Sequence, residues 1–268
     1  MPQLRVNGTS LYYEDSGGPG EVVLFSHGLL FSAAMFEQQV RAFAPRYRCI
    51  AYDHRGQGRS ADPSGRLHDI EDVTADAAAL IRALAIAPCH FAGLSMGGFV
   101  GMRLAARHPE LLRSLTLLET SADPEPAENV PRYRALAFVA RWFGLRVIVG
   151  RVMPILFSRS FLADPARAPE RALWRGRLAA NRRSVVRAVL GVIERRGIAD
   201  ELGGVRVPTL IIVGEEDVAT VPAKAERIHA LIQGSRLVRI AGAGHSSCIE
   251  QPERVNETIG SFLDSLTR

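Results

Sequence analysis

Short apolar runs alternate with helical patterns along most of this chain. The runs typical of buried strands lie at residues 22–25, 49–52, 90–92, 115–118, 209–213 and 237–240. Helical patterns lie between and after them, at residues 33–43, 72–84, 97–107 and 253–266 and directly after Pro222. A hairpin around Asn7-Gly8 precedes them. This order predicts an α/β fold in which helices cover both faces of a mainly parallel, twisted sheet.

The alternation is interrupted between residues 121 and 200. Residues 121–131 are rich in Pro, Asp and Glu and predict a linker, and residues 131–200 show only helical patterns, such as the one over 133–149. The interruption is also basic, because residues 123–202 hold 15 arginines against 8 acids. We therefore predict an α/β core of residues 1–120 and 201–268, with residues 121–200 inserted as helices over the carboxyl edge of the sheet.

The run Gly93-Leu94-Ser95-Met96-Gly97-Gly98 follows a predicted strand and opens a predicted helix. It fits the pattern Gly-x-Ser-x-Gly, in which a sharp turn raises the serine above the sheet and small residues allow neighbouring elements to approach. Near the helix N-terminus, the Met96 N–H would stabilise developing negative charge. The pattern predicts Ser95 as a catalytic nucleophile.

A serine nucleophile needs a base, and a base needs an orienting acid. His245 lies in a glycine-flanked loop after the last predicted strand, and Asp217 follows the strand that ends at Val213. The chain order Ser, Asp, His is the one expected of this strand-to-helix serine motif. The neighbours Glu215 and Glu216 and the more distant Glu119 stay open as alternative acids.

The loop after residues 22–25 is suited to complete an oxyanion hole. Gly28 lets the chain turn tightly, so that the Leu29 N–H faces the same point as the Met96 N–H. We expect His27 to brace this loop by hydrogen bonding and not to carry protons.

These landmarks resemble, in order, those of the α/β-hydrolase fold superfamily. The resemblance rests on His27-Gly28, the Asp-His-Arg-Gly-Gln-Gly-Arg-Ser run at 53–60, the Ser95 turn, the Asp217 loop and the His245 loop. It implies that residues 53–60 form a structural loop and that the insertion corresponds to the family's helical cap. The serine in the turn argues against haloalkane dehalogenases and epoxide hydrolases, which attack through a carboxylate.

The sequence looks most like enol-lactone hydrolases and small carboxylesterases, through the Ser95 motif and the run Glu250-Gln251-Pro252-Glu253. That resemblance implies a serine hydrolase that cleaves a carboxylic ester or lactone through an acyl-enzyme. The alternatives are a carbon–carbon bond hydrolase or perhydrolase of the same fold, or a non-catalytic ligand-binding homologue. We expect no metal and no organic cofactor.

The substrate is expected to be a small molecule held under the insertion. The apolar side chains predicted to bind it are Leu30, Trp142, Phe143 and Phe157. The net charge of +5 lacks interleaved stacking aromatics, so we expect no nucleic-acid partner.

The remaining expectations concern the setting of the protein. No uncharged apolar run is long enough for stable membrane insertion, and no signal peptide is expected at the N-terminus. The three cysteines are far apart, which favours a reducing, cytoplasmic setting. The almost exclusive use of arginine over lysine hints at a bacterial source, and we expect a monomer or a homodimer.

Overall fold

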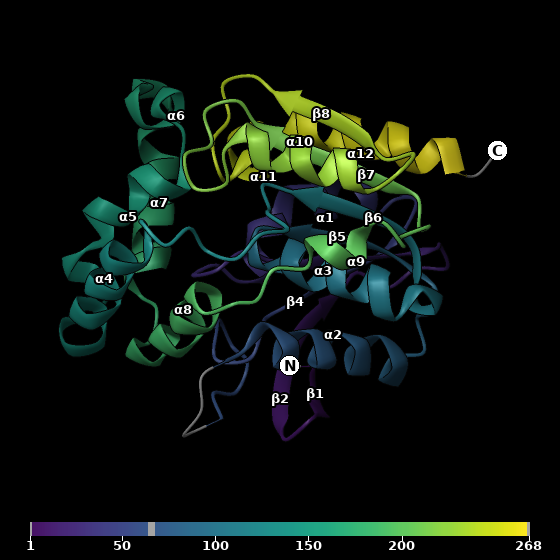
Figure 1. Cartoon of the computed structure of the whole chain (residues 1–268), viewed down its shortest axis with the longest axis horizontal. Coiled ribbons are helices and arrows are strands. Elements are labelled where there is room, and N and C mark those ends of the chain that lie inside the picture. The colour runs from purple at the N-terminus through teal and green to yellow at the C-terminus, as the bar shows by residue number, and fades with distance from the viewer. Residues whose placement is uncertain (1, 64–67, 267–268) are drawn as a thin grey trace.

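The computed structural model describes residues 2–63 and 68–266, within which eight strands form one sheet (Figure 1). The strand order is β1-β2-β4-β3-β5-β6-β7-β8. β2 pairs antiparallel with β1 and β4, and from β4 onward every neighbouring pair is parallel. The strands are β1 (Gln3–Val6), β2 (Thr9–Asp15), β3 (Val22–Ser26), β4 (Arg48–Tyr52), β5 (Cys89–Leu94), β6 (Leu112–Leu118), β7 (Thr209–Gly214) and β8 (Arg236–Ile240). The predicted α/β fold with a mainly parallel sheet is confirmed.

The sheet begins with the hairpin that the Asn-Gly pair predicts. Asn7 and Gly8 adopt φ angles of 43° and 73°, and Val6 pairs with Thr9 across the turn. Two successive positive φ angles give a turn whose twist matches that of the strands it joins.

The central strands are apolar on both faces, because each face is covered by helices. In β3, Val23 and Phe25 belong to one buried cluster and Leu24 to the other, as the alternation of side chains along a strand requires. The first cluster includes residues of α1 (Glu37–Phe43), α11 (Ser247–Glu250) and α12 (Pro252–Leu266). The second includes residues of α2 (Ile70–Ala83), α3 (Met96–Arg107), α9 (Ala199–Leu202) and α10 (Pro222–Leu231).

Between β6 and β7 the chain forms only helices within the described residues. Apart from α9, which packs on the core, they are α4 (Val130–Phe143), α5 (Val149–Leu156), α6 (Arg159–Ala163), α7 (Ala168–Ala179) and α8 (Val186–Ile193), with short 3-10 turns between several of them. Figure 1 shows these helices, coloured teal to green, gathered on one side of the sheet. We call this segment, residues 121–200, the insertion.

The helix predicted over 133–149 is shorter than expected. α4 ends at Phe143, and a separate helix, α5, begins at Val149. The break lies at Gly144, whose φ of 82° is a conformation in which glycine commonly ends helices. The apolar periodicity continues across the break and therefore concealed it.

The two segments that connect the insertion to the core lie against each other. The Ile198 N–H donates to the Ala122 carbonyl at 2.7 Å, and Arg195 pairs with Glu125 at 3.0 Å. The Arg195 guanidinium also lies 4.3 Å from the centre of the Phe99 ring of α3. The chain therefore leaves and re-enters the core at one joined point.

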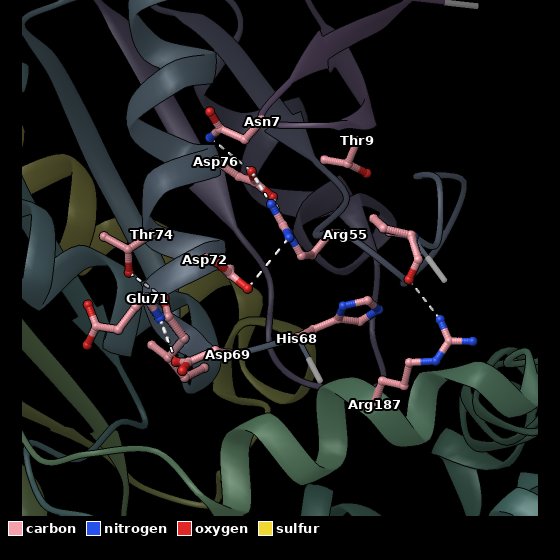
Figure 2. A network of polar contacts seen from close by, with 12 residues as sticks. Asn7, Thr9, Arg55, His68, Asp69, Glu71, Asp72, Thr74, Asp76 and Arg187 are labelled. Carbon is pink, nitrogen blue, oxygen red and sulfur yellow. Dashed lines mark hydrogen bonds and ion pairs between the residues drawn. The ribbon is translucent and has the colours of Figure 1, made fainter. Parts of the chain in front are cut away.

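Helix α8 makes a second attachment, to the loop that precedes α2. A Cβ on Gly191 would lie 2.0 Å from the His68 carbonyl oxygen, so the helix backbone approaches this loop as closely as a glycine permits. Arg187 and His68 both contact the Asp62 carboxylate, at 2.7 and 2.9 Å, and Figure 2 shows Arg187 of α8 facing this loop. The insertion is thus fixed to the core on both sides of β3.

Candidate active site

Ser95 lies in the sharp turn between β5 and α3. Its backbone has φ 51° and ψ −107°, a strained conformation for a residue with a side chain. A Cβ on Gly93 would lie 2.2 Å from the Gly97 carbonyl oxygen, and a Cβ on Gly97 would lie 2.0 Å from the Ser26 carbonyl oxygen. Glycines at these two spacings are therefore what allows the turn to form.

The backbone of Ser95 is held from three sides. Its N–H donates to the Leu118 carbonyl at 2.8 Å, and its carbonyl accepts the Thr120 hydroxyl at 2.9 Å and the Phe99 N–H at 3.0 Å. Both backbone polar groups of Ser95 are therefore hydrogen-bonded, and its hydroxyl is the polar group left to face the cavity.

His245 and Asp217 lie on the neighbouring loops after β8 and β7 and are joined by a hydrogen bond. The distance from His245 Nδ1 to Asp217 Oδ2 is 2.9 Å, and both residues are buried. An ionised carboxylate only accepts, so Nδ1 carries the proton in this bond and Nε2 is left with its lone pair. His245 is thus held in the tautomer that a general base requires.

Asp217 is further held by residues that the sequence reasoning missed. Its Oδ1 accepts the Ala219 and Thr220 N–H groups at 2.7 and 3.0 Å, and its Oδ2 accepts the Thr220 hydroxyl at 2.8 Å. An Asp whose side chain bonds the backbone two residues later is a common turn signal, and the run Asp-Val-Ala-Thr contained it. Burial opposes ionisation, but His245 and Thr220 outweigh it and hold the pKa of Asp217 below its usual value.

The alternative acids lie in different settings. Glu119 is fully buried and accepts the Gly214 N–H at 3.1 Å. Burial, with the nearby Asp217 carboxylate, raises the pKa of Glu119 well above its usual value. Glu215 is exposed, and Glu216 accepts the Ser160 N–H of the insertion at 3.0 Å.

The loop after β3 is shaped by a histidine brace and a glutamine. His27 Nδ1 donates to the Gly28 carbonyl at 2.7 Å, and its Nε2 accepts the His54 N–H at 3.0 Å. Burial lowers the pKa of His27, which keeps the ring neutral in this bracing role. Leu30 turns the chain with a φ of 71°, and its N–H donates to Gln57 Oε1 at 2.8 Å.

Residues 53–60 form the structural loop that the resemblance implied. The Asp53 carboxylate accepts the Ala33 and Arg59 N–H groups at 2.6 and 2.7 Å. Arg55 lies between Asp72 and Asp76 of α2, with two contacts of 2.6 Å to Asp76 (Figure 2). This loop joins the sheet, α2 and the turn at Leu30.

Ser95 and His245 line one cavity of about 140 Å³ between the core and the insertion. The insertion lines it with apolar side chains of α4, α5 and α8 together with Tyr133 and the Glu125–Arg195 pair. The core contributes the loop after β3 and the Ser95 turn. The apolar members from both parts are Gly28, Leu29, Leu30, Phe31, Leu94, Phe99, Leu136, Val152, Ile155, Leu156, Val189, Val192, Ile193 and Ala219.

Of the four side chains predicted to bind substrate, the structure places Leu30 on this cavity and the others elsewhere. Trp142 and Phe143 are 57% and 63% exposed. Trp142 lies about half a turn around α4 from Tyr133, which lines the cavity, and Phe143 lies at the end of that helix. Phe157 is buried, with its ring centre 5.0 Å from that of Phe161 and 6.3 Å from that of Phe31 in the core, so it packs the insertion onto the core.

No cluster of three or more His, Cys, Asp or Glu side chains in residues 2–63 and 68–266 is arranged to hold a metal ion. In the same residues, no helix has both the length and the apolar character needed to cross a bilayer.

The chain is similar to proteins of a known family. Residues 21–252 match the family model described as the alpha/beta hydrolase fold. A non-heme haloperoxidase from Rhodococcus erythropolis is 29% identical over 97% of both chains.

Two solved structures have the same fold throughout. The enol-lactonase from Burkholderia xenovorans LB400 superimposes with a TM-score of 0.90 at 29% identity, covering 98% of this chain and all of that one. A thermophilic esterase from Thermogutta terrifontis gives a TM-score of 0.90 at 30% identity, covering 99% of both chains.

Proposed function

The chain belongs to the esterase and lactonase branch of the alpha/beta hydrolase family, and we propose that it cleaves a carboxylic ester or lactone through an acyl-enzyme on Ser95. One observation carries the proposal. Ser95 and His245 line the same cavity, and Asp217 engages the far nitrogen of the His245 ring. A serine, a base and an acid that orients the base are what nucleophilic acyl transfer requires.

In the first step, His245 Nε2 removes the hydroxyl proton of Ser95 as its oxygen attacks the substrate carbonyl. The imidazole becomes positively charged, and the ionised Asp217 beside Nδ1 stabilises that charge. The low pKa of Asp217 keeps it ionised through this step. The protonated imidazole then gives its proton to the leaving alkoxide.

The oxyanion of the tetrahedral intermediate is assigned to the Leu29 and Met96 N–H groups. The Leu30 N–H is committed to Gln57, whereas the Leu29 N–H makes no hydrogen bond within the described residues. The Met96 N–H opens α3, where helix N–H groups have no intrahelical acceptor. Each donor is expected to contribute about 3 kcal/mol to lowering the barrier.

In the second step, water attacks the acyl-enzyme, and His245 again removes a proton. The same oxyanion donors serve both steps, and Ser95 is restored when the acid product leaves. Neither step calls on a metal or an organic cofactor.

The insertion acts in this proposal as a cap that selects the substrate. The cavity wall it provides is apolar along α4, α5 and α8. An apolar wall favours an ester or lactone with a hydrocarbon acyl or alcohol part of modest size.

The test is a kinetic comparison of the purified protein with Ser95→Ala on p-nitrophenyl esters of graded chain length. The proposal predicts a loss of about 10⁴-fold or more in kcat/KM for the variant, with its melting temperature retained. Equal rates for the two proteins would mean that the fold serves here as a binding module.

The same comparison on other substrate classes separates the remaining reactions. Simple lactones, an acyl-homoserine lactone, a vinylogous diketone, and an ester supplied with peroxide are assayed in parallel. The proposal predicts the highest Ser95-dependent kcat/KM on an ester or lactone. A higher value on the diketone or with peroxide would replace it with carbon–carbon hydrolysis or perhydrolysis.

A further inference from the structure

A short turn of the insertion, residues 158–160 at the start of α6, rests on the loops that carry both Asp217 and His245. Two carboxylates of the core accept hydrogen bonds from this turn. Glu216, the neighbour of Asp217, accepts the Ser160 N–H at 3.0 Å and also the Ser160 hydroxyl. Glu250, on α11 just after the His245 loop, accepts the Ser158 N–H at 2.8 Å.

The Glu250 carboxylate also binds the backbone on either side of His245. Its Oε1 accepts the N–H groups of Gly244 and Ser246, at 3.0 and 3.1 Å, one on each side of the histidine. Its Oε2 takes the Ser158 N–H. One buried carboxylate therefore fixes the backbone before and after His245 and joins it to the insertion.

The close approach of the two segments depends on a glycine. A Cβ on Gly244 would lie 2.5 Å from the Ser158 nitrogen and 2.9 Å from its Cα. The absence of a side chain at 244 lets the insertion backbone reach the carboxylate that holds the histidine loop.

A guanidinium strengthens the same contact. Arg167 Nη1 donates to the Glu250 carbonyl at 2.9 Å, and its Nη2 donates to the Ile249 carbonyl at 3.2 Å. This two-point contact of a charged group adds to the bond between Ser158 and Glu250 in holding α11 against the insertion.

We propose that Glu250 is a positioning residue for His245 and that the Ser158 N–H makes this positioning depend on how the insertion is seated. The inference rests on the proposed function, because it concerns the orientation of the proposed base. A displaced insertion would remove one of the three N–H groups from the carboxylate and release the loop that aims the imidazole. The turnover number kcat would then fall, whereas the cavity that binds the substrate would stay largely unchanged.

Two variants test the bonds that Glu250 makes, one by changing its carboxylate and one by changing the Ser158 donor. In Glu250→Gln the single amide oxygen serves either the histidine loop or Ser158, and the amide nitrogen faces an N–H donor on the other side. Ser158→Pro removes the N–H donor to Glu250 together with the hydroxyl, and the proline ring keeps the carboxylate away from residue 158. The backbone accepts proline here, because Ser158 has φ −61° and the preceding Phe157 is extended.

Each variant has a matched control. Glu253→Gln removes an exposed carboxylate three residues from Glu250. Ser158→Ala removes the hydroxyl that caps α6 but keeps the N–H, so a comparison with Ser158→Pro isolates the contact between the residue 158 backbone and Glu250.

The measurements are kcat and KM on a p-nitrophenyl ester, the rate at which a fluorophosphonate labels Ser95, and the melting temperature of every variant. We expect kcat and the labelling rate to fall about tenfold or more in Glu250→Gln and Ser158→Pro, with KM changed by less than about threefold. Ser158→Ala and Glu253→Gln should stay within about twofold of the wild type.

The inference is overturned if Glu250→Gln keeps the wild-type kcat, or if Ser158→Pro and Ser158→Ala lose the same amount. It is also overturned if KM rises while kcat is unchanged, since that pattern means altered substrate binding. Loss of Ser95-dependent hydrolysis in the wild type itself is a different result, which would overturn the proposed function. If Glu250→Gln does not fold, the Ser158 pair decides.

Discussion

Backbone strain is concentrated at the carboxyl ends of three neighbouring strands. Leu30, Ser95 and Glu119, in the turns after β3, β5 and β6, all have positive φ angles, of 71°, 51° and 42°. Such strained conformations persist only where surrounding contacts hold them in place, and they are common at functional sites. Here the surroundings are the hydrogen bond from Leu30 to Gln57, the bonds that hold the Ser95 backbone, and the bond from Gly214 to Glu119.

The glycines around Ser95 give the first prediction at this scale. Gly97→Ala should destabilise the fold by about 3 kcal/mol and abolish hydrolysis, because its Cβ would overlap the Ser26 backbone. Gly176→Ala, in α7 with nothing within 4 Å of the added Cβ, is the control and should stabilise by about 0.7 kcal/mol. Chemical denaturation of both variants checks the opposite signs. A Gly97→Ala protein with wild-type stability would contradict the packing argument.

The second prediction concerns Glu119 and pH. Burial raises the pKa of Glu119 well above its ordinary 4.5, so folding favours the protonated form. Its contribution to stability is fully present below the ordinary pKa and is lost as the pH rises through the raised, folded-state value. Glu119→Gln carries no such proton. Its melting temperature relative to the wild type should therefore increase from about pH 5 to about pH 9. A difference that is constant with pH would mean that Glu119 is ionised in the fold.

At the scale of elements, the sequence identified the parts better than their mutual orientation. Every apolar run expected to be a strand is one, because a strand buried on both faces needs only a short continuous apolar run between turns. The site loops could be located for a similar reason, since they follow strands in a fixed order. The roles of Ala219, Thr220 and Glu250 were missed, because each depends on local contacts with the Asp217 carboxylate or the His245 loop that only the folded backbone brings about.

The substrate side chains were harder to predict than the strands. Trp142 and Phe143 are large and apolar, but which face of α4 meets the cavity depends on how that helix packs, and the packing places Tyr133 and Leu136 there. Gly144 then ends the helix and separates α4 from α5. The apolar periodicity of this arginine-rich segment predicts helices, but it does not predict which face of α4 meets the cavity or where α4 ends.

The third prediction follows from that orientation of α4. Leu136→Trp should lower kcat/KM for the longer p-nitrophenyl esters about tenfold or more, with a smaller effect on the acetate, because it fills the cavity that Ser95 shares. Trp142→Ala, on the exposed side of the same helix, should leave the chain-length profile unchanged. A profile changed by Trp142→Ala and untouched by Leu136→Trp would show that substrate meets the other face.

At the scale of the whole molecule, the core and the insertion are joined around the cavity. The connecting segments meet at the Glu125–Arg195 pair, α8 rests on the loop at His68, and α6 rests on the loops of Asp217 and His245. The core supplies Ser95, His245 and Asp217, and the apolar residues that line the cavity come in equal number from the core and from the insertion. In the proposed function the core therefore carries the chemistry, and the core and the insertion together shape the pocket that selects the substrate.

The central claim is that Ser95 forms a covalent acyl-type intermediate with the help of His245. The most direct measurement is intact-mass and peptide-mass analysis after reaction with a fluorophosphonate ester, which traps an activated serine. The account predicts one adduct per chain, on the peptide that contains Ser95, absent in Ser95→Ala and formed at least about 10³-fold more slowly in His245→Ala. An adduct on another residue, or equal labelling of the wild type and His245→Ala, would contradict it.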